Sequence, residues 1–418
     1  MMRSVKDEGR LPPAPLLQAA LRSTTNRLAV ELATPGHGAP DWSDFEWRAA
    51  MAVAVMHGVS ALLAGRLRWQ GPPAWQAFLD EQAGQGRLRE QRVRGLLARL
   101  DAGAREAGLA LLAMKGSALL ALGLYAPGER PMSDVDLLAH PADAAAADRL
   151  ILGSGYRLDL VKRRHRAYEP LDQPADRAFG EHETNPIKIE LHDAVREPLP
   201  LREVDITASL LPPAARPGLH PYPSPAALMR HLLLHAAGNV CNRCVRLIQL
   251  HDIARLAIGL DVTQWDEALA PASDGRPAWW AVPPLRLVQT LFPGCLPEAA
   301  TVALARATAA CPPWLRHADF DLVETSLSWL AIPMLPGIVW SRRPAEAIGL
   351  AWQRLRPGHD GRVITTEWLS RQHCMADSAW SYRPRWLKAL SFLLGSPPRV
   401  QTLYSLHQAL DYRPSSSA

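Results

Sequence analysis

The spacing of hydrophobic and polar residues changes twice along this chain. Up to about residue 105, apolar residues recur every three or four positions, which is typical of amphipathic helices. Residues 47–66 and 81–104 show this period, and the second segment has a polar face rich in arginine: Arg87, Arg89, Arg92, Arg94 and Arg99. We interpret these arginines as a solvated helix face. A surface that faces phosphate or nucleic acid is the alternative.

From residue 109 the pattern mixes strands and helices. Short apolar runs and strict alternation predict strands at residues 109–114, 133–139, 156–160 and 187–192. The first of these ends in Lys115-Gly116-Ser117, which predicts a turn into a helix that Ser117 caps and that reaches about Tyr125. Residues 142–152 predict an alanine-rich helix that Gly153 ends.

After residue 198 the helical period returns. Ser224-Pro225 is a strong helix start, followed by a helix over 226–237 with Gly238 as its stop, and a second helix is expected over about 243–257. We therefore predict a predominantly helical α+β protein with a small mixed-sheet core. The expected divisions are a helical region 1–105, a core 106–197, a helical region 198–412 and a disordered tail 413–418.

Composition narrows the class of protein. The chain has 418 residues with 48% hydrophobic and 21% charged residues, so we expect a folded protein of two to three compact units, or of one catalytic domain with large additions. A net charge of +5 spread over this length permits nucleic acid as a partner but does not indicate it. Five cysteines do not form a disulfide framework, and the first 15 residues lack the apolar core of a signal peptide. We expect a cytoplasmic protein.

Two apolar runs in the sequence are candidates for membrane-spanning segments. Residues 107–126 contain the central charge of Lys115 and are interrupted by three glycines, and residues 327–340 are short and contain two prolines. Neither run is a good span, so no membrane-spanning segment is expected.

Three carboxylates are candidates for chemistry. Asp134 and Asp136 are two residues apart on one predicted strand, so they leave the same face ~7 Å apart, and Glu190 lies on the charged face of another. Such a group is stable mainly when a hard cation neutralises it. A pair of Mg²⁺ ions, which Mn²⁺ could replace, held in this way serves in-line phosphoryl displacement.

The turn before the second strand could bind the phosphates. Gly116 and Ser117 would offer backbone N–H groups and a hydroxyl at a positive helix end, and Arg130 could reach phosphate oxygens from the connecting loop. Lys115 is either a phosphate contact or a strand-end lysine that reaches solvent. His192 shares a face with Glu190, where it has either a role in the site or a structural hydrogen bond.

These segments together resemble a known family. Residues 112–120, 130–138 and 189–192, with Tyr125 and Gly155-Tyr156, resemble the uncharacterised nucleotidyltransferase family of the DNA polymerase beta-like superfamily, over about residues 50–260. The likeness extends to His235 and to 246–252.

The resemblance implies roles for individual residues. Asp134 and Asp136 would be metal ligands, Glu190 the third ligand or base, and Gly116-Ser117 the triphosphate turn, with His235 packed or hydrogen-bonded beside the site. The implied reaction is Mg²⁺-dependent transfer of a nucleoside monophosphate from an NTP to an acceptor, with release of pyrophosphate. Neither the base of the NTP nor the acceptor, which could be a small molecule, a peptide or a protein, can be read from the sequence.

Two other functions stay open. The first is a non-catalytic nucleotide-binding or regulatory module on the same fold. The second is a zinc-stabilised, RNA-binding helical protein, suggested by the basic pI and the spacing of four possible ligands: His231, His235, Cys241 and Cys244. The basic cluster 163–166 either faces the acceptor or triphosphate or is a basic loop.

Overall fold

The structure is a computed structural model of the 418-residue chain. It describes residues 11–161, 165–172, 178–199, 202–211, 216–271, 275, 277–331, 337–355, 387 and 398–413. The tail predicted to be disordered lies, apart from its first residue, outside the described residues.

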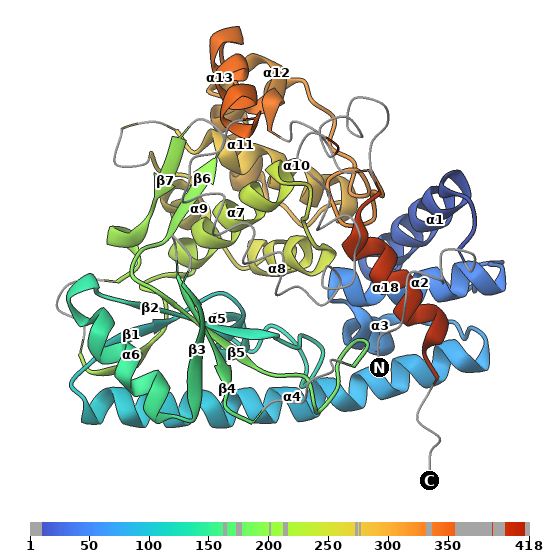
Figure 1. The fold of residues 1–418 in the computed structure, drawn as a ribbon. Coiled ribbons are helices and arrows are strands. Elements are labelled where there is room, and N and C mark those ends of the chain that lie inside the picture. Colours follow the sequence, from blue (N-terminus) through green and yellow to red (C-terminus); the bar gives the residue numbers. More distant parts are fainter. Residues whose placement is uncertain are drawn as a thin grey trace.

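The N-terminal region is helical, as predicted. It consists of four helices: α1 (Ala14–Ala33), α2 (Asp44–His57), α3 (Ser60–Arg66) and α4 (Pro73–Glu106). Ser43 and Glu46 start α2 with a capping box, in which each side chain satisfies the backbone N–H of the other residue. The long helix α4 extends from this helical group to beneath the sheet (Figure 1), so one element supports both parts.

A six-stranded mixed sheet forms the core. Its strands are β1 (Ala110–Ala113), β2 (Asp134–Ala139), β3 (Tyr156–Val161), β4 (Arg166–Pro170), β5 (Lys188–His192) and β8 (Gly218–His220), in the order β3-β4-β5-β2-β1-β8. The pairs β2–β5 and β1–β8 are parallel, and the others are antiparallel. A separate hairpin consists of β6 (Arg196–Leu199) and β7 (Arg202–Asp205). The predicted α+β class with a small mixed sheet is confirmed.

The alternation in β2 decides which face of the sheet carries the polar groups. Val135 and Leu137 pack in one apolar cluster with residues of α4 and of α6 (Ala144–Gly153). Leu138 belongs instead to the larger cluster that contains the C-terminal helices. Asp134 and Asp136 share the face of Leu138 because side chains alternate along a strand. The carboxylates therefore point toward the C-terminal helices, which lie above the sheet in Figure 1.

The short helix α5 (Gly116–Ala121) differs from its prediction. It ends at Ala121 rather than near Tyr125, and Gly123 follows with a φ of 64°. Ser117 does not cap it: the N-cap position is Lys115, whose side chain makes no capping hydrogen bond. The prediction of a Ser117 cap was therefore wrong, because the helix begins two residues earlier than a cap at Ser117 would require.

Most helices of the C-terminal region form a layer above the sheet, and the last of them, α18 (Val400–Asp411), lies beside the N-terminal helices (Figure 1). The other longer helices of the region are α7 (Pro225–Cys241), α8 (Leu247–Ala257), α10 (Val282–Leu291), α11 (Glu298–Ala309) and α13 (Pro344–Leu355), and the shorter ones are α9 (Val262–Ala268) and α12 (Pro313–Arg316). Single 3-10 turns are η2 (Pro141–Asp143), η3 (Thr207–Ser209), η4 (Trp279–Ala281) and η5 (Ile338–Trp340).

Two predictions about α7 had different outcomes. Ser224 caps the helix through Ala227 N–H, as predicted. Gly238 does not stop it, because the helix continues to Cys241. A Cβ at Gly238 would come within 2.3 Å of the Glu197 carboxylate, so glycine is present here for close packing rather than for helix termination.

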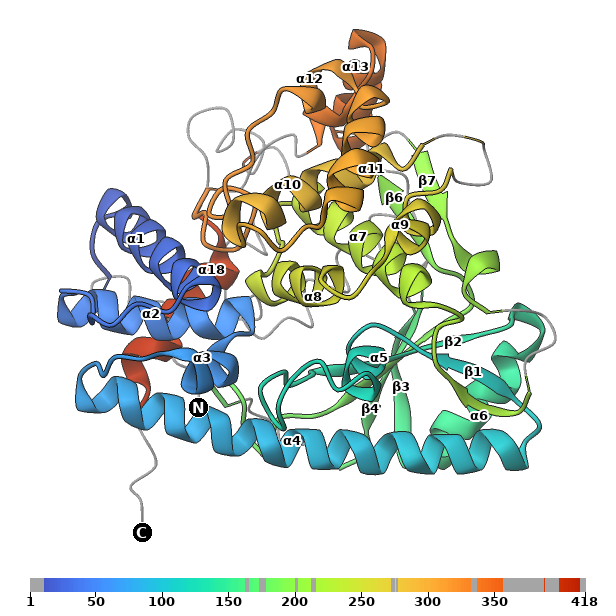
Figure 2. The ribbon, with the colours of Figure 1, turned by 180° about the vertical axis from the view of Figure 1, so that it is seen from behind.

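The last described helix packs against the N-terminal helices. Helix α18 lies beside α1–α3 in both views (Figures 1 and 2), and Arg48 Nη1 donates to the carbonyl oxygens of Ala409 and Tyr412. No single helix in the described ranges is long and apolar enough to cross a membrane. The pair α2–α3, bent by 112°, meets the length and composition test only when taken together.

Candidate functional site

Two parallel strands bring the predicted carboxylates together. In the β2–β5 ladder Asp136 lies directly opposite Glu190, and Asp134 lies opposite Lys188. Asp134, Asp136 and Glu190 all line one cavity of about 200 Å³ between the sheet and helices α7 and α8. Neighbouring strands lie only about 4.8 Å apart, so this register places the two opposing carboxylates next to each other.

Lys115 adds a cation to the carboxylates. Its Nζ donates to Asp136 Oδ1 at 2.8 Å, and its backbone N–H donates to Tyr222 Oη. The backbone of Lys115 has a φ of 48°, which residues other than glycine rarely adopt. Its backbone is therefore strained at this turn. The structure therefore directs Lys115 into the site rather than toward solvent, which was the other interpretation of a strand-end lysine.

Two histidines border the same carboxylates. His192 Nε2 lies 3.1 Å from Asp136 Oδ1 and 3.8 Å from Glu190 Oε2. His165 Nε2 lies 3.2 Å from Glu190 Oε1. The imidazole rings of His165 and His192 are 4.9 Å apart. In the sequence analysis His165 is only a member of the basic cluster 163–166. Arg163 and Arg164 of this cluster lie outside the described residues.

The electrostatics of the three carboxylates differ. Burial and the negative charges of Asp136 and Glu190 raise the pKa of Asp134 to about 6. Burial also opposes the ionisation of Asp136, but Lys115 and His192 outweigh it and hold the pKa of Asp136 far below its usual range. In Glu190 burial is outweighed by the adjacent imidazole of His165, so the pKa falls to about 2. Asp134 is therefore the carboxylate whose ionised form these surroundings favour least.

Lys115 and His192 respond to the same field. Burial disfavours the charged ammonium of Lys115, but Asp136, Glu190 and Asp134 outweigh it and raise its pKa above the ordinary value. Burial lowers the pKa of His192 despite Asp136, so its imidazole is neutral at neutral pH. One ammonium thus faces three carboxylates, a donor set that suits an additional divalent cation.

Two arginines line the same cavity. Arg130 forms two hydrogen bonds to the carboxylate of the buried Asp252, at 3.0 and 2.6 Å, and Tyr125 Oη donates to the same carboxylate at 2.7 Å. Arg130, predicted as a phosphate contact, is thus already held by Asp252.

Arg246 differs from Arg130 in its partners. Its Nε donates to the carbonyl oxygen of Met56, and its side chain lines the cavity. It has no ion-pair partner within 4.0 Å among the described residues. Burial and the nearby charge of Arg130 lower its pKa, whereas Asp134 raises it. A guanidinium without an ion-pair partner in the described part of the chain therefore lines the cavity that holds the three carboxylates.

Gly116 and Ser117 have different surroundings. Gly116 lines the cavity, and a Cβ there would meet Met132 Sδ at 2.3 Å and Arg130 Nη1 at 3.2 Å, so only glycine fits. Ser117 is buried, and its Oγ has no hydrogen-bond partner among the described residues. Ser117 is not one of the lining residues of the cavity, so the structure brings Gly116 but not the Ser117 hydroxyl to it.

The predicted zinc ligands do not converge. His231 Nδ1 pairs with Tyr222 Oη at 2.6 Å, whereas His235 Nε2 and Cys244 Sγ both contact the Asn239 side chain. His235 lines the cavity, as the resemblance implied. In the part of the chain that the structure describes, the compact ligand group is a different one: His165, Glu190 and His192, whose ligand atoms lie within 4.8 Å of one another.

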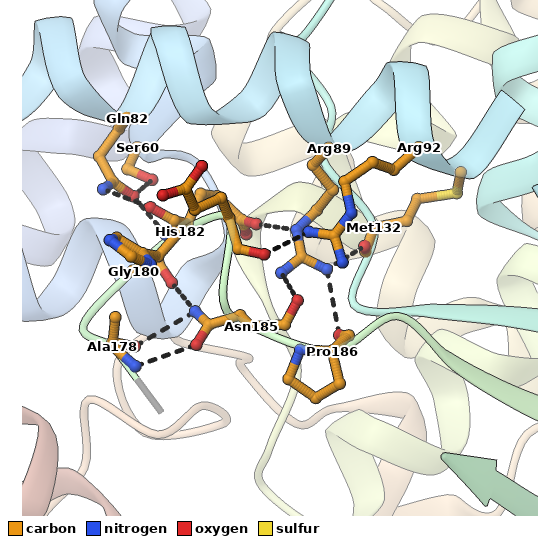
Figure 3. Close-up of polar contacts among 12 residues, drawn as sticks. Ser60, Gln82, Arg89, Arg92, Met132, Ala178, Gly180, His182, Asn185 and Pro186 are labelled. Atoms are coloured by element: carbon orange, nitrogen blue, oxygen red, sulfur yellow. Dashed lines mark hydrogen bonds and ion pairs between the residues drawn. The ribbon is translucent and has the colours of Figure 1, made fainter. Parts of the chain in front are cut away.

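The prediction that the arginines of α4 form a solvated helix face is partly wrong. Arg89 is only 4% exposed, so it does not belong to a solvated helix face. Its guanidinium donates to the carbonyl oxygens of Met132, Asn185 and Pro186 and pairs with Glu181 (Figure 3). These contacts bind the loop 178–186 to α4, and this loop supplies Glu181 to the cavity.

Sequence reasoning missed several lining residues. Glu181, Gln249 and Arg246 all line the cavity although none was a candidate. The signal for Arg246 was present, because it belongs to a segment included in the family resemblance. Glu181 had no comparable signal, since it lies in a loop with no periodic pattern.

Comparison with known families agrees with this geometry. Residues 43–293, more than half of the chain, match the model of an uncharacterised nucleotidyltransferase family. The chain belongs to this family. No curated protein and no solved structure matches it. The matched residues span α2 to α10 and so include the sheet, the carboxylates and both helices that close the cavity.

Proposed function

We propose that the protein transfers a nucleoside monophosphate from an NTP to an acceptor, with release of pyrophosphate. The observation that carries the proposal is the β2–β5 register, which sets Asp136 opposite Glu190 on the strand face that also carries Asp134. Family membership supports nucleotidyl transfer in general.

The donor set fits Mg²⁺, with Mn²⁺ as a substitute. Asp134, Asp136 and Glu190 supply carboxylate oxygens, which are the ligands that these ions prefer. Burial and the negative charges of Asp136 and Glu190 raise the pKa of Asp134, and a bound cation would favour its ionised form. Bound Mg²⁺, in one or two ions, would neutralise charge on the phosphates and on the attacking oxygen.

Other residues that line the cavity suit the triphosphate of the NTP. Arg246 would hold phosphate oxygens with its guanidinium, and Gly116 would let the phosphates approach the backbone at the turn before α5. Arg130, held by Asp252, would add positive potential to the cavity. Lys115 would bind a phosphate oxygen once its ammonium leaves Asp136.

The acceptor would enter from the other side of Glu190. A second cavity of about 150 Å³ shares Lys115, Glu190 and His235 with the first and is also lined by His165, His192 and Glu197. An acceptor hydroxyl in this cavity would lie beside Glu190, which would take its proton. The base of the NTP and the identity of the acceptor are outside this proposal.

One observation favours a second function, a non-catalytic nucleotide-binding module. Lys115 Nζ already neutralises Asp136 at 2.8 Å, which is a position from which an ammonium can replace a metal ion. In such a module an NTP would bind without Mg²⁺ and no pyrophosphate would form.

Thermal-shift titration with each of the four NTPs, with and without Mg²⁺, separates these functions. A ligand at 100 times its Kd stabilises the fold by about 2.7 kcal/mol, enough to raise Tm measurably. The proposal expects Mg²⁺-dependent stabilisation by at least one NTP, lost in Asp134→Asn and in Asp136→Asn. Stabilisation by an NTP that ignores Mg²⁺ would support the module, and no shift with any NTP would contradict both functions.

A further inference from the structure

A second group of metal ligands lies next to the carboxylates already described. We propose that His165, His192 and Glu190 form a binding site for one transition-metal ion such as Zn²⁺, Mn²⁺, Fe²⁺ or Co²⁺, next to the proposed Mg²⁺ site, with which it shares Glu190. The inference goes beyond nucleotidyl transfer and does not depend on it, because the site includes none of Asp134, Arg130 and Arg246.

The backbone register explains why these three residues meet. Glu190 and His192 are two residues apart in β5 and therefore share one face. In the antiparallel β4–β5 ladder Arg166 lies opposite Leu191 and Ala167 opposite Glu190. One further step in this register places His165 opposite His192, which agrees with the 4.9 Å between their rings. The two strands thus present all three groups on one face.

The distances suit a metal ion. Both imidazoles direct Nε2 at the same carboxylate, His165 at 3.2 Å from Oε1 and His192 at 3.8 Å from Oε2. All three ligand atoms lie within 4.8 Å of one another. Ligands at about 2.0–2.2 Å from a common ion are separated by roughly 3–4 Å, so small side-chain rotations would complete the coordination.

His165 supplies an independent observation. Its Nε2 is buried and makes no hydrogen bond among the described residues, although it lies beside Glu190. A buried polar atom without a hydrogen bond usually has a bound ion or water as its partner. All three groups also line the second cavity, so an ion can reach them without unfolding of the sheet.

The ligand types indicate which ion binds. Two imidazoles and one carboxylate are typical of zinc, iron and other first-row transition metals, whereas Mg²⁺ prefers oxygen ligands only. Glu190 would be shared between this site and the carboxylate cavity. Asp136 Oδ1, 3.1 Å from His192 Nε2, is close enough to orient the imidazole.

Cobalt spectroscopy of the full-length protein tests the site. Co²⁺ bound to imidazole and carboxylate ligands gives visible absorption bands, so titration of metal-free protein reports stoichiometry and affinity without any enzyme assay. We expect one Co²⁺ per chain, displaced by Zn²⁺. Even loss of a group that only orients a ligand costs about 10–100-fold in affinity, so His165→Gln and His192→Gln should each weaken binding by about 100-fold or more.

Matched variants exclude other causes. His37→Ala removes an exposed histidine far along the chain from the site and should leave Co²⁺ binding unchanged. Asp134→Asn should also keep Co²⁺ binding while losing Mg²⁺-dependent NTP binding, so failure of this site and failure of the proposed function are distinguishable. The proposal would be overturned by absence of Co²⁺ bands in the wild type, or by a Co²⁺ affinity in either Gln variant equal to that of the wild type.

Discussion

Lys115 Nζ lies 2.8 Å from Asp136 Oδ1, at the point where three carboxylates of the sheet face the C-terminal helices. The ammonium therefore occupies a position that suits a metal cation. Because an ammonium and a divalent ion repel each other at short range, Lys115 would compete with the proposed Mg²⁺ for the same carboxylates.

Replacement of Lys115 should strengthen metal binding. Lys115→Gly removes the competing ammonium and also relieves the strained φ of 48°. We expect Mg²⁺ or Mn²⁺ affinity, measured by calorimetry, to rise about tenfold, which corresponds to about 1.4 kcal/mol. In the absence of metal the variant should have a lower Tm, because Asp136 loses its main positive partner.

Lys188→Ala is the control for this variant. Lys188 pairs with Asp159 and Glu169 and does not line the cavity, so its removal changes net charge equally without affecting metal affinity. An unchanged or weaker metal affinity in Lys115→Gly would show that the ammonium does not compete with the ion.

The raised pKa of Asp134 predicts a pH-dependent stability difference. Its folded pKa of about 6 exceeds the ordinary value of 3.8, so the folded state binds the proton more tightly than the unfolded state. Protonated Asp134 therefore adds to the free energy of unfolding. This contribution is fully present below pH 3.8 and is lost as the pH rises to about 6. The total loss is on the order of 2–3 kcal/mol.

Asp134→Asn isolates this effect. Buried histidines such as His57 and His251, whose pKa values fall to about 3 and about 4, act in the opposite direction in both proteins. They cancel in the difference between variant and wild type. The stability advantage of Asp134→Asn, measured by urea unfolding without metal, should therefore grow from pH 4 to pH 6 and then stay constant. A difference that does not change with pH would refute the assignment.

Gly58 controls the position of Arg246. A Cβ at Gly58 would lie 2.3 Å from Arg246 Nη2, so Gly58→Ala must displace the guanidinium. If Arg246 binds the triphosphate, NTP affinity should fall about tenfold or more, as measured by calorimetry in the presence of Mg²⁺.

Gly108→Ala provides a closely matched control. Gly58 and Gly108 have φ values of 68° and 69°, but a Cβ at Gly108 meets nothing within 4 Å. Both alanine variants therefore carry a similar backbone strain of about 1–2 kcal/mol, and only Gly58→Ala moves Arg246. Equal NTP affinity in the two variants would remove Arg246 from the binding site.

Local sequence patterns predicted the elements of the core well. Strict alternation in β2 and β5 identified both strands and the faces that carry Asp136 and Glu190, because side chains alternate regularly along a strand. The Ser224 cap of α7 was also predictable, since capping depends on a few neighbouring residues. The role of Gly238 was not predictable, because the side chain that requires a glycine there, Glu197, belongs to the β6–β7 hairpin.

The site itself depended on contacts between distant segments. Sequence by itself determined which residue types lie on each strand face, and it included the carboxylates because their spacing is local. Only the tertiary structure decided that Asp252 holds Arg130, that Arg246 lines the same cavity as the carboxylates, and that His165 joins Glu190 and His192. The reason is physical: strand register and helix packing are set by burial over the whole core, and no local period encodes which distant side chains they bring together.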